Sequence, residues 1–339
     1  MSSPTGTSSV SALAPRSGRR RRRPLRAYLE AYALVGCLVA IAVFFSLYSE
    51  TADTFPTAGN LKTLLGNEAV LGIVALAALV PLVCGQFDLS VGAITGLSSI
   101  VVADTMSSGT PVLLTALIGI GIGLTIGTVN GLLVTVAGVN SVIATLGTAT
   151  IAAGIVAQES GGVAIAGNIP DSVFNFGSGE TLGIPNVAYV LLVVAVAVYY
   201  LLDHTPIGRY VYALGSNVSA ARLVGLRTDR VLAFSFVVAG VLAGMAGVLQ
   251  VARTGGADPR LGDNFTLAAF AAAFLSAASV RPGRFNVGGA MVGIFFLAVL
   301  NSGLSLAGAP DYVALYVNGL ALIIGVALAV FLGKRRLAV

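Results

Sequence analysis

One carboxylate stands between two long apolar runs of this chain, in the segment Gly85-Gln86-Phe87-Asp88-Leu89-Ser90-Val91-Gly92. A buried acid in apolar surroundings is costly, so its presence indicates a function. The side chains of Asp88 and Ser90 are candidates for hydrogen bonding to a passing solute or for forming a gate. Alternatively, Asp88 caps a helix that begins at Leu89, because Asp is favoured at that position and its charge suits a helix N-terminus.

Three further polar residues interrupt apolar runs elsewhere, namely Asn130, Thr145 and Asn301. Each could contact a solute in a membrane path. Each could equally donate or accept a hydrogen bond between neighbouring helices, which is a common role of such residues in membrane proteins. Both interpretations stay open at this point.

The residue types that most enzymes and metal sites need are scarce. The single histidine, His204, lies at the boundary of an apolar run, and no His, Cys and Glu cluster has metal-ligand spacing. No Gly-x-x-x-x-Gly-Lys loop is present to bind a nucleotide. Cys37 and Cys84 both fall in apolar runs and indicate no disulfide. The sequence therefore predicts neither an enzyme nor a metal or other cofactor.

Composition defines the class of protein that must position these residues. Only 10% of the 339 residues are charged and 56% are hydrophobic, whereas soluble domains carry about 25% charged residues. Apolar runs long enough to span a bilayer recur along the chain, and 42 glycines fit close helix packing. In particular, the glycine-rich runs 119–123 and 240–244 indicate helix contacts. The expected fold is an all-α polytopic membrane protein.

About ten transmembrane helices are expected. Asp88 is nearly alone as a carboxylate within them. They cover residues 27–47, 68–84, 88–105, 111–136, 141–157, 185–202, 231–252, 264–280, 285–305 and 312–332. Residues 1–26 are expected to form a disordered basic cytoplasmic tail, 27–332 the membrane domain and 333–339 a second cytoplasmic tail.

Charge asymmetry indicates that both termini are cytoplasmic. Seven of the nineteen basic residues lie between Arg16 and Arg26, and the loop 203–230 carries four arginines, whereas the loop 158–184 carries none. Basic residues concentrate on the cytoplasmic side of membrane proteins. The same distribution explains the net charge of +5 without nucleic-acid binding.

The inner loop 203–230 contains Ser219-Ala220-Ala221-Arg222-Leu223-Val224, an amphipathic piece between Gly215 and Gly225. The pattern fits a short helix lying at the cytoplasmic membrane surface. An ordinary solvated linker is the alternative.

Four segments, in order and with similar spacing, resemble the permease subunits of ribose-type ATP-binding-cassette (ABC) importers, which carry sugars and related small polyols. They are Asp88-Leu89-Ser90-Val91-Gly92; Asn130-Gly131-Leu132-Leu133-Val134-Thr135 with Ala144-Thr145-Leu146-Gly147-Thr148; Thr205-Pro206-Ile207-Gly208-Arg209 with Ala220-Ala221-Arg222; and Pro282-Gly283-Arg284-Phe285-Asn286.

The resemblance implies a role for the inner loop as a coupling helix that docks into a groove of a cytoplasmic ABC ATPase. The residues that would carry this role are Gly208, Arg209, Ala220, Ala221, Arg222 and Gly225. Asp88, Ser90, Asn130, Thr145 and Asn301 become candidates for the substrate pathway or gate.

Further partners implied by the resemblance are an extracytoplasmic solute-binding protein, a second identical or related permease chain, and the lipid of a bacterial cytoplasmic membrane. ATP hydrolysis would belong to the separate ATPase. The alternatives are a branched-chain amino acid ABC permease, whose signature lacks the Asp-Leu-Ser-Val-Gly run, a secondary carrier, and a purely structural membrane scaffold.

Overall fold

The computed structural model describes residues 25–337, and side chains over 31–331. Residues 1–24 of the predicted tail 1–26 therefore lie outside the described residues. The same is true of the last two residues of the predicted tail 333–339. The first helix begins at Leu25 and the last continues to Leu337.

Every predicted span corresponds to one long helix. These helices are α1 (Leu25–Leu47), α2 (Ala58–Val83), α3 (Val91–Ser107), α4 (Val112–Thr135), α5 (Ser141–Ser160), α7 (Asn186–His204), α10 (Thr228–Thr254), α11 (Leu261–Leu275), α12 (Val287–Leu306) and α13 (Tyr312–Leu337). Within the described residues, eight helices are long and apolar enough to cross a membrane; α1 and α3 contribute shorter apolar stretches, Ala31–Leu47 and Val91–Ser107. The polytopic all-α fold is thus confirmed.

Short elements connect these helices. They are α6 (Asp171–Ser178), α8 (Pro206–Ser216), α9 (Val218–Leu223), the 3-10 turn η1 (Ser276–Ala278), and the two-residue strands β1 (Ile165–Ala166), β2 (Glu180–Thr181), β3 (Ile184–Pro185) and β4 (Gly256–Ala257). The strands form two antiparallel pairs, β1 with β4 and β2 with β3.

Two helix boundaries differ from the prediction for identifiable reasons. Helix α2 begins ten residues before the predicted start, because Thr57 accepts a hydrogen bond from the Asn60 amide and caps a polar first part that hydropathy does not detect. Helix α11 ends at Leu275 rather than continuing to residue 280, because η1 follows and Val280 adopts a φ of 59°.

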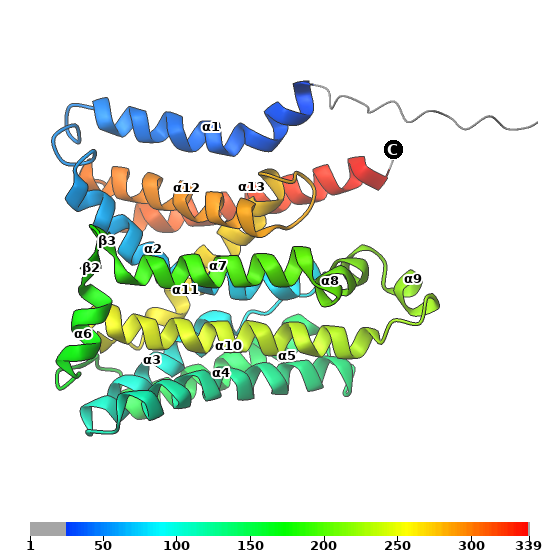
Figure 1. Cartoon of the computed structure of the whole chain (residues 1–339), viewed down its shortest axis with the longest axis horizontal. Coiled ribbons are helices and arrows are strands. Elements are labelled where there is room, and N and C mark those ends of the chain that lie inside the picture. Colours follow the sequence, from blue (N-terminus) through cyan, green and yellow to red (C-terminus); the bar gives the residue numbers. More distant parts are fainter. Residues whose placement is uncertain (1–24, 338–339) are drawn as a thin grey trace, which may run out of the picture.

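The two ends of the bundle differ in what they carry (Figure 1). Helices α8 and α9 lie at the end where α1 begins and α13 finishes, and α6 with β2 and β3 lies at the opposite end. We call these the inner and outer ends. The loop between α7 and α10, with its four arginines, belongs to the inner end, as the predicted charge asymmetry requires.

Glycines bring α4 and α10 into close contact. A Cβ added to Gly123 would collide with the Gly240 carbonyl oxygen, and one added to Gly244 would lie 2.7 Å from the Gly119 carbonyl oxygen. The predicted small-residue helix contact is therefore confirmed. Helix α2 forms the core, and its second half is almost wholly buried.

Candidate functional site

Asp88 lies in the buried turn that joins α2 to α3. Its Oδ1 accepts hydrogen bonds from the Ser90 amide at 3.0 Å and the Ser90 hydroxyl at 2.5 Å. The predicted cap of a helix starting at Leu89 is wrong in its position, because α3 begins at Val91 and its N-cap Ser90 makes no side-chain cap. Asp88 instead holds the turn that precedes the helix.

The Ser90 hydroxyl links this turn to two more helices. Asn130 of α4 donates from Nδ2 to Ser90 Oγ at 2.8 Å, and Thr148 of α5 donates from Oγ1 to Asn130 Oδ1 at 2.8 Å. Thr145 of α5 accepts from the Leu89 amide at 3.0 Å. We call Asp88, Ser90, Asn130, Thr145 and Thr148 the Asp88 cluster.

Four of the five predicted pathway residues therefore meet in one place, and sequence reasoning left out only Thr148. The side chains of Asp88, Ser90, Asn130 and Thr145 have no exposed surface. Phe87 fixes the same turn by packing against Phe270 and Phe274 of α11, with ring centroids 6.3 and 5.9 Å apart. This geometry favours hydrogen bonding between helices as the role of the cluster, and a role in the pathway stays a prediction.

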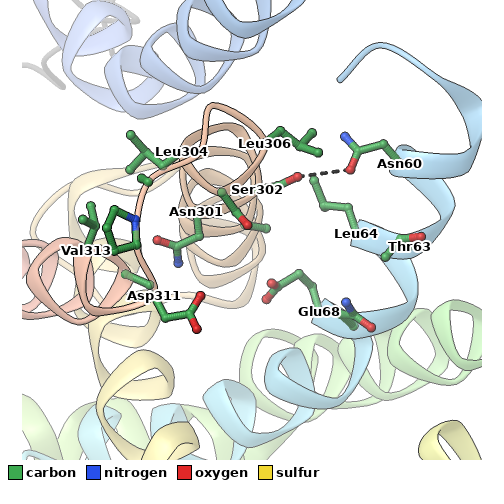
Figure 2. Close-up of a pocket in the computed structure, with 16 residues that line it drawn as sticks. Asn60, Thr63, Leu64, Glu68, Asn301, Ser302, Leu304, Leu306, Asp311 and Val313 are labelled. Atoms are coloured by element: carbon green, nitrogen blue, oxygen red, sulfur yellow. Dashed lines mark hydrogen bonds between the residues drawn. The ribbon is translucent and has the colours of Figure 1, made fainter. Parts of the chain in front are cut away.

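Asn301, the fifth predicted residue, lies apart from the cluster on α12. Its Nδ2 donates to Asn318 Oδ1 of α13 at 3.4 Å, and its Oδ1 is buried without a hydrogen-bond partner among the described residues. It lines a cavity at the outer end, across which Glu68 of α2 projects (Figure 2).

Glu68 corrects the expectation that Asp88 is nearly alone among carboxylates within the spans. Because the predicted span started at residue 68, Glu68 was placed at the membrane boundary. In the structure it lies ten residues inside α2, which is about 15 Å along the helix axis. The helix start could have been recognised from Thr57 and Asn60, since Thr is a favoured N-cap.

The inner loop forms two capped helices. Thr205 accepts from the Gly208 amide at 3.1 Å at the start of α8, and Asn217 accepts from the Ala220 amide at 3.0 Å at the start of α9. Gly225, with a φ of 81°, follows α9 and reverses the chain toward α10. The predicted short helix is therefore present, over Val218–Leu223.

Helix α8 is fixed to the turn that precedes α12. The Tyr212 hydroxyl donates to the Phe285 carbonyl oxygen at 2.9 Å, and the Arg284 guanidinium lies 3.5 Å from the centroid of the Tyr212 ring. Arg281 forms an ion pair with Asp203. Burial raises the pKa of Tyr212, and the hydrogen bond that Arg281 donates to Asp203 raises the pKa of Arg281.

Close backbone contact also positions α8. A Cβ on Gly208 would collide with the carbonyl oxygen of Leu202 at the end of α7. The predicted role of Gly208 in setting the start of the loop has this packing as its physical basis. Helix α8 is therefore in direct contact with the end of α7 and with the turn before α12.

The predicted coupling residues point in different directions. Ala221 is buried within the chain, whereas Ala220, Gly225 and Arg209 are exposed. Arg222 bonds within its own loop, with Nε 3.1 Å from Thr228 Oγ1 and an ion pair to Asp229 at 3.5 Å.

Sequence reasoning missed the two apolar side chains that α9 and its C-cap present to the surroundings. Leu223 is 89% exposed and Val224 is 76% exposed. This exposed apolar pair is a candidate for a contact surface. Their place two and three residues after the buried Ala221 is the pattern in the sequence that points to them.

The described residues contain no group of three or more His, Cys, Asp or Glu side chains that could hold a metal ion. The His204 ring packs against Tyr199 and Tyr200, and Cys37 and Cys84 are free. These residues have structural surroundings and no reactive partners within the described part of the chain.

Comparison with known proteins places this geometry in context. The family model described as "Branched-chain amino acid transport system / permease component" matches residues 60–326. The ribose import permease protein of Bacillus subtilis (strain 168) is 34% identical, over 87% of this chain and 92% of its own length.

Two proteins of Escherichia coli (strain K12) are similar over the same region. Its ribose import permease protein is 30% identical, over 85% of this chain and 91% of its own length. Its D-allose transport system permease protein is 32% identical, over 87% and 90%. No solved structure matches the chain.

Proposed function

This chain belongs to the permease family of ABC importers, and we propose that its cargo is a sugar or a related small polyol. It is a multi-pass membrane protein. The cargo class rests on the ribose and D-allose names of relatives that align with more than four-fifths of the chain. The proposed partners are a cytoplasmic ATPase, an extracytoplasmic binding protein and a second permease chain.

The proposed mechanism is alternating access. A binding protein delivers the solute to the outer end, and two permease chains enclose the path. Closure of the ATPase subunits on ATP moves α8 and α9 and reorients the spans. ATP and solute shift this equilibrium only by binding the two orientations with different affinity.

One observation carries the coupling part of the proposal: the exposed pair Leu223 and Val224 sits on a segment that is tied to the membrane helices. Tyr212 and Arg284 join α8 to the start of α12, and Gly208 joins it to α7. A force applied at α9 is thereby transmitted to two spans. Ala221 contributes by packing α9 onto its own chain, and Leu223 and Val224 enter the groove of the ATPase.

Co-purification of the ATPase with a tagged permease tests this assignment. The variant Leu223→Asp places a charge in the proposed apolar contact and leaves the fold intact, because the side chain is exposed. We expect at least about a tenfold loss of co-purified ATPase, since burying an unpaired charge at an interface costs several kcal/mol.

Leu182→Asp is the matched control. Leu182 is 93% exposed in the turn between β2 and β3 at the outer end, so the same change there should leave ATPase binding unchanged. Full ATPase recovery with the Leu223 variant would contradict the coupling assignment.

The description of the matching family favours one second candidate, a branched-chain amino acid as cargo. Competition separates the two: radiolabelled D-ribose uptake by the complete importer should fall with excess D-allose and stay unchanged with excess L-leucine. Absence of D-ribose uptake, together with uptake of radiolabelled L-leucine that excess D-ribose does not reduce, would favour the amino acid.

A further inference from the structure

A cavity of about 440 Å³ lies at the outer end, between the first turns of α2, the last turns of α12 and the loop that leads into α13. Figure 2 shows Glu68, Asn301 and Asp311 projecting into it from these three elements. The cavity is separate from the Asp88 cluster and from the α8–α9 segment.

The polar lining has acceptors that lack donors. Glu68 makes no hydrogen bond or ion pair within the described residues, and its Oε2 and the Oδ1 of Asn301 are both buried without a partner. None of the lining residues is Lys or Arg. A carboxylate oxygen that is buried without a donor is costly, and a ligand that supplies donors would offset this cost.

Two polar residues of the lining, Ser302 and Asn60, already have hydrogen-bond partners. Ser302 Oγ lies 3.1 Å from Asn60 Oδ1, and Asn60 Nδ2 donates to the Phe55 carbonyl oxygen at 2.9 Å. This network links α12 to α2 and fixes the cavity's upper wall. Glu68 and Asn301 keep their free acceptor oxygens within a preformed frame.

The lining also includes the polar residues Thr63, Asn67 and Ser305, and its apolar part includes Leu64, Leu304, Leu306 and Val313. A preformed cavity of roughly 300–1,000 Å³ with apolar walls and a few placed polar groups is typical of small-molecule sites. A sugar has both hydrogen-bond donors and an apolar face. Its hydroxyls donate to carboxylates, and its C–H face packs on aliphatic side chains.

We propose that this cavity is an outer binding site for a hydroxyl-rich solute, with Glu68 and Asn301 accepting hydrogen bonds from its hydroxyl groups and Asp311 at the rim. The inference rests on the proposed import of a sugar or polyol and names the residues that receive it. A simple cation is disfavoured because the space greatly exceeds one ion and because the described residues hold no metal-binding group.

A fluorescent reporter tests the site directly. The chain contains no tryptophan, so Leu306→Trp introduces a single reporter at the cavity wall, in a residue that is 37% exposed. The full-length reporter protein in lipid nanodiscs is titrated with D-ribose, D-allose, L-leucine, and sodium or potassium chloride at constant ionic strength. We expect a saturable change with at least one of the two sugars and none with leucine or the salts.

Glu68→Gln in the reporter background should raise the dissociation constant for that sugar about tenfold, because a hydrogen bond to a charged acceptor is replaced by a weaker neutral one. Asp311→Asn, on the rim, should raise it less. The matched control is Glu159→Gln, an exposed glutamate at the outer end, which should leave the dissociation constant unchanged.

Suppose that the Leu306→Trp reporter, without a further substitution, responds to neither sugar although the complete complex imports one of them. This result would overturn the cavity assignment and leave the proposed function intact. A response to salt alone would identify a cation site and also overturn it. Failure of the complete complex to import either sugar would count against the proposed function instead.

Discussion

Asp88 and Glu68 are two carboxylates of the membrane domain that have buried oxygens without a partner among the described residues, and their surroundings differ. Asp88 sits in a closed cluster in which one oxygen receives two hydrogen bonds and the helices around it are joined through Ser90 and Asn130. Glu68 makes no hydrogen bond within the described residues and faces a cavity of about 440 Å³. The two acidic residues therefore differ in their hydrogen-bond partners and in their access to a cavity.

The difference shows how the cost of burial is met in each case. Around Asp88 the protein supplies two donors to Oδ1, whereas Oδ2 has no partner among the described residues, and the carboxylate holds a closed turn beside α3, α4 and α5. Around Glu68 the protein supplies space and acceptors, which leaves the donors to a ligand. Removal of the two side chains should accordingly change different properties of the molecule.

The largest effect is expected for Asp88→Ala. The variant leaves the buried Ser90 amide and hydroxyl without their acceptor, at a cost of about 3 kcal/mol in the free energy of unfolding. Thermal unfolding of the detergent-purified protein should show a clearly lower Tm and a reduced folded yield. An unchanged Tm would show that the cluster does not hold these helices together.

Glu68→Gln should produce the reverse pattern. Removing an unpaired buried charge leaves the Tm unchanged or higher, while sugar uptake at subsaturating concentration by the complete importer falls about tenfold. Uptake and Tm are measured on the same preparations. A fall in Tm with normal uptake would show that Glu68 has a structural role, and Glu68 would then not differ from Asp88 in this respect.

The smallest effect is expected for Asp88→Asn. The amide oxygen of Asn can still accept from the Ser90 amide and hydroxyl, so both the Tm and sugar uptake should stay close to those of the wild type. Impaired uptake in a stable protein would instead show that the negative charge of Asp88 contributes to the pathway.

Hydropathy predicted the ten membrane helices because each apolar run is long enough to span a bilayer as a helix, whereas a strand or a short loop segment would need fewer apolar residues. It misplaced the start of α2 because the first ten residues of that helix, including Asn60 and Lys62, are polar on the outer side. Glu68 was missed for the same reason, since its depth depends on where the helix begins.

The candidate site was predicted unevenly. Asp88, Ser90, Asn130 and Thr145 were identified from polar residues in apolar runs, and the structure brings them together. Their mutual hydrogen bonds depend on tertiary packing, which no local pattern gives. In α9, residue type singled out the small Ala221, whereas only the folded loop reveals that Leu223 and Val224 are the side chains facing outward.

ATP-driven uptake into reconstituted vesicles tests the account most directly. Vesicles holding the permease with its ATPase, binding protein and ATP should accumulate labelled sugar, and vesicles holding the permease alone should not. Accumulation of the sugar against its gradient by the permease alone, without nucleotide, would contradict the assignment of this chain as a conduit driven by a separate subunit.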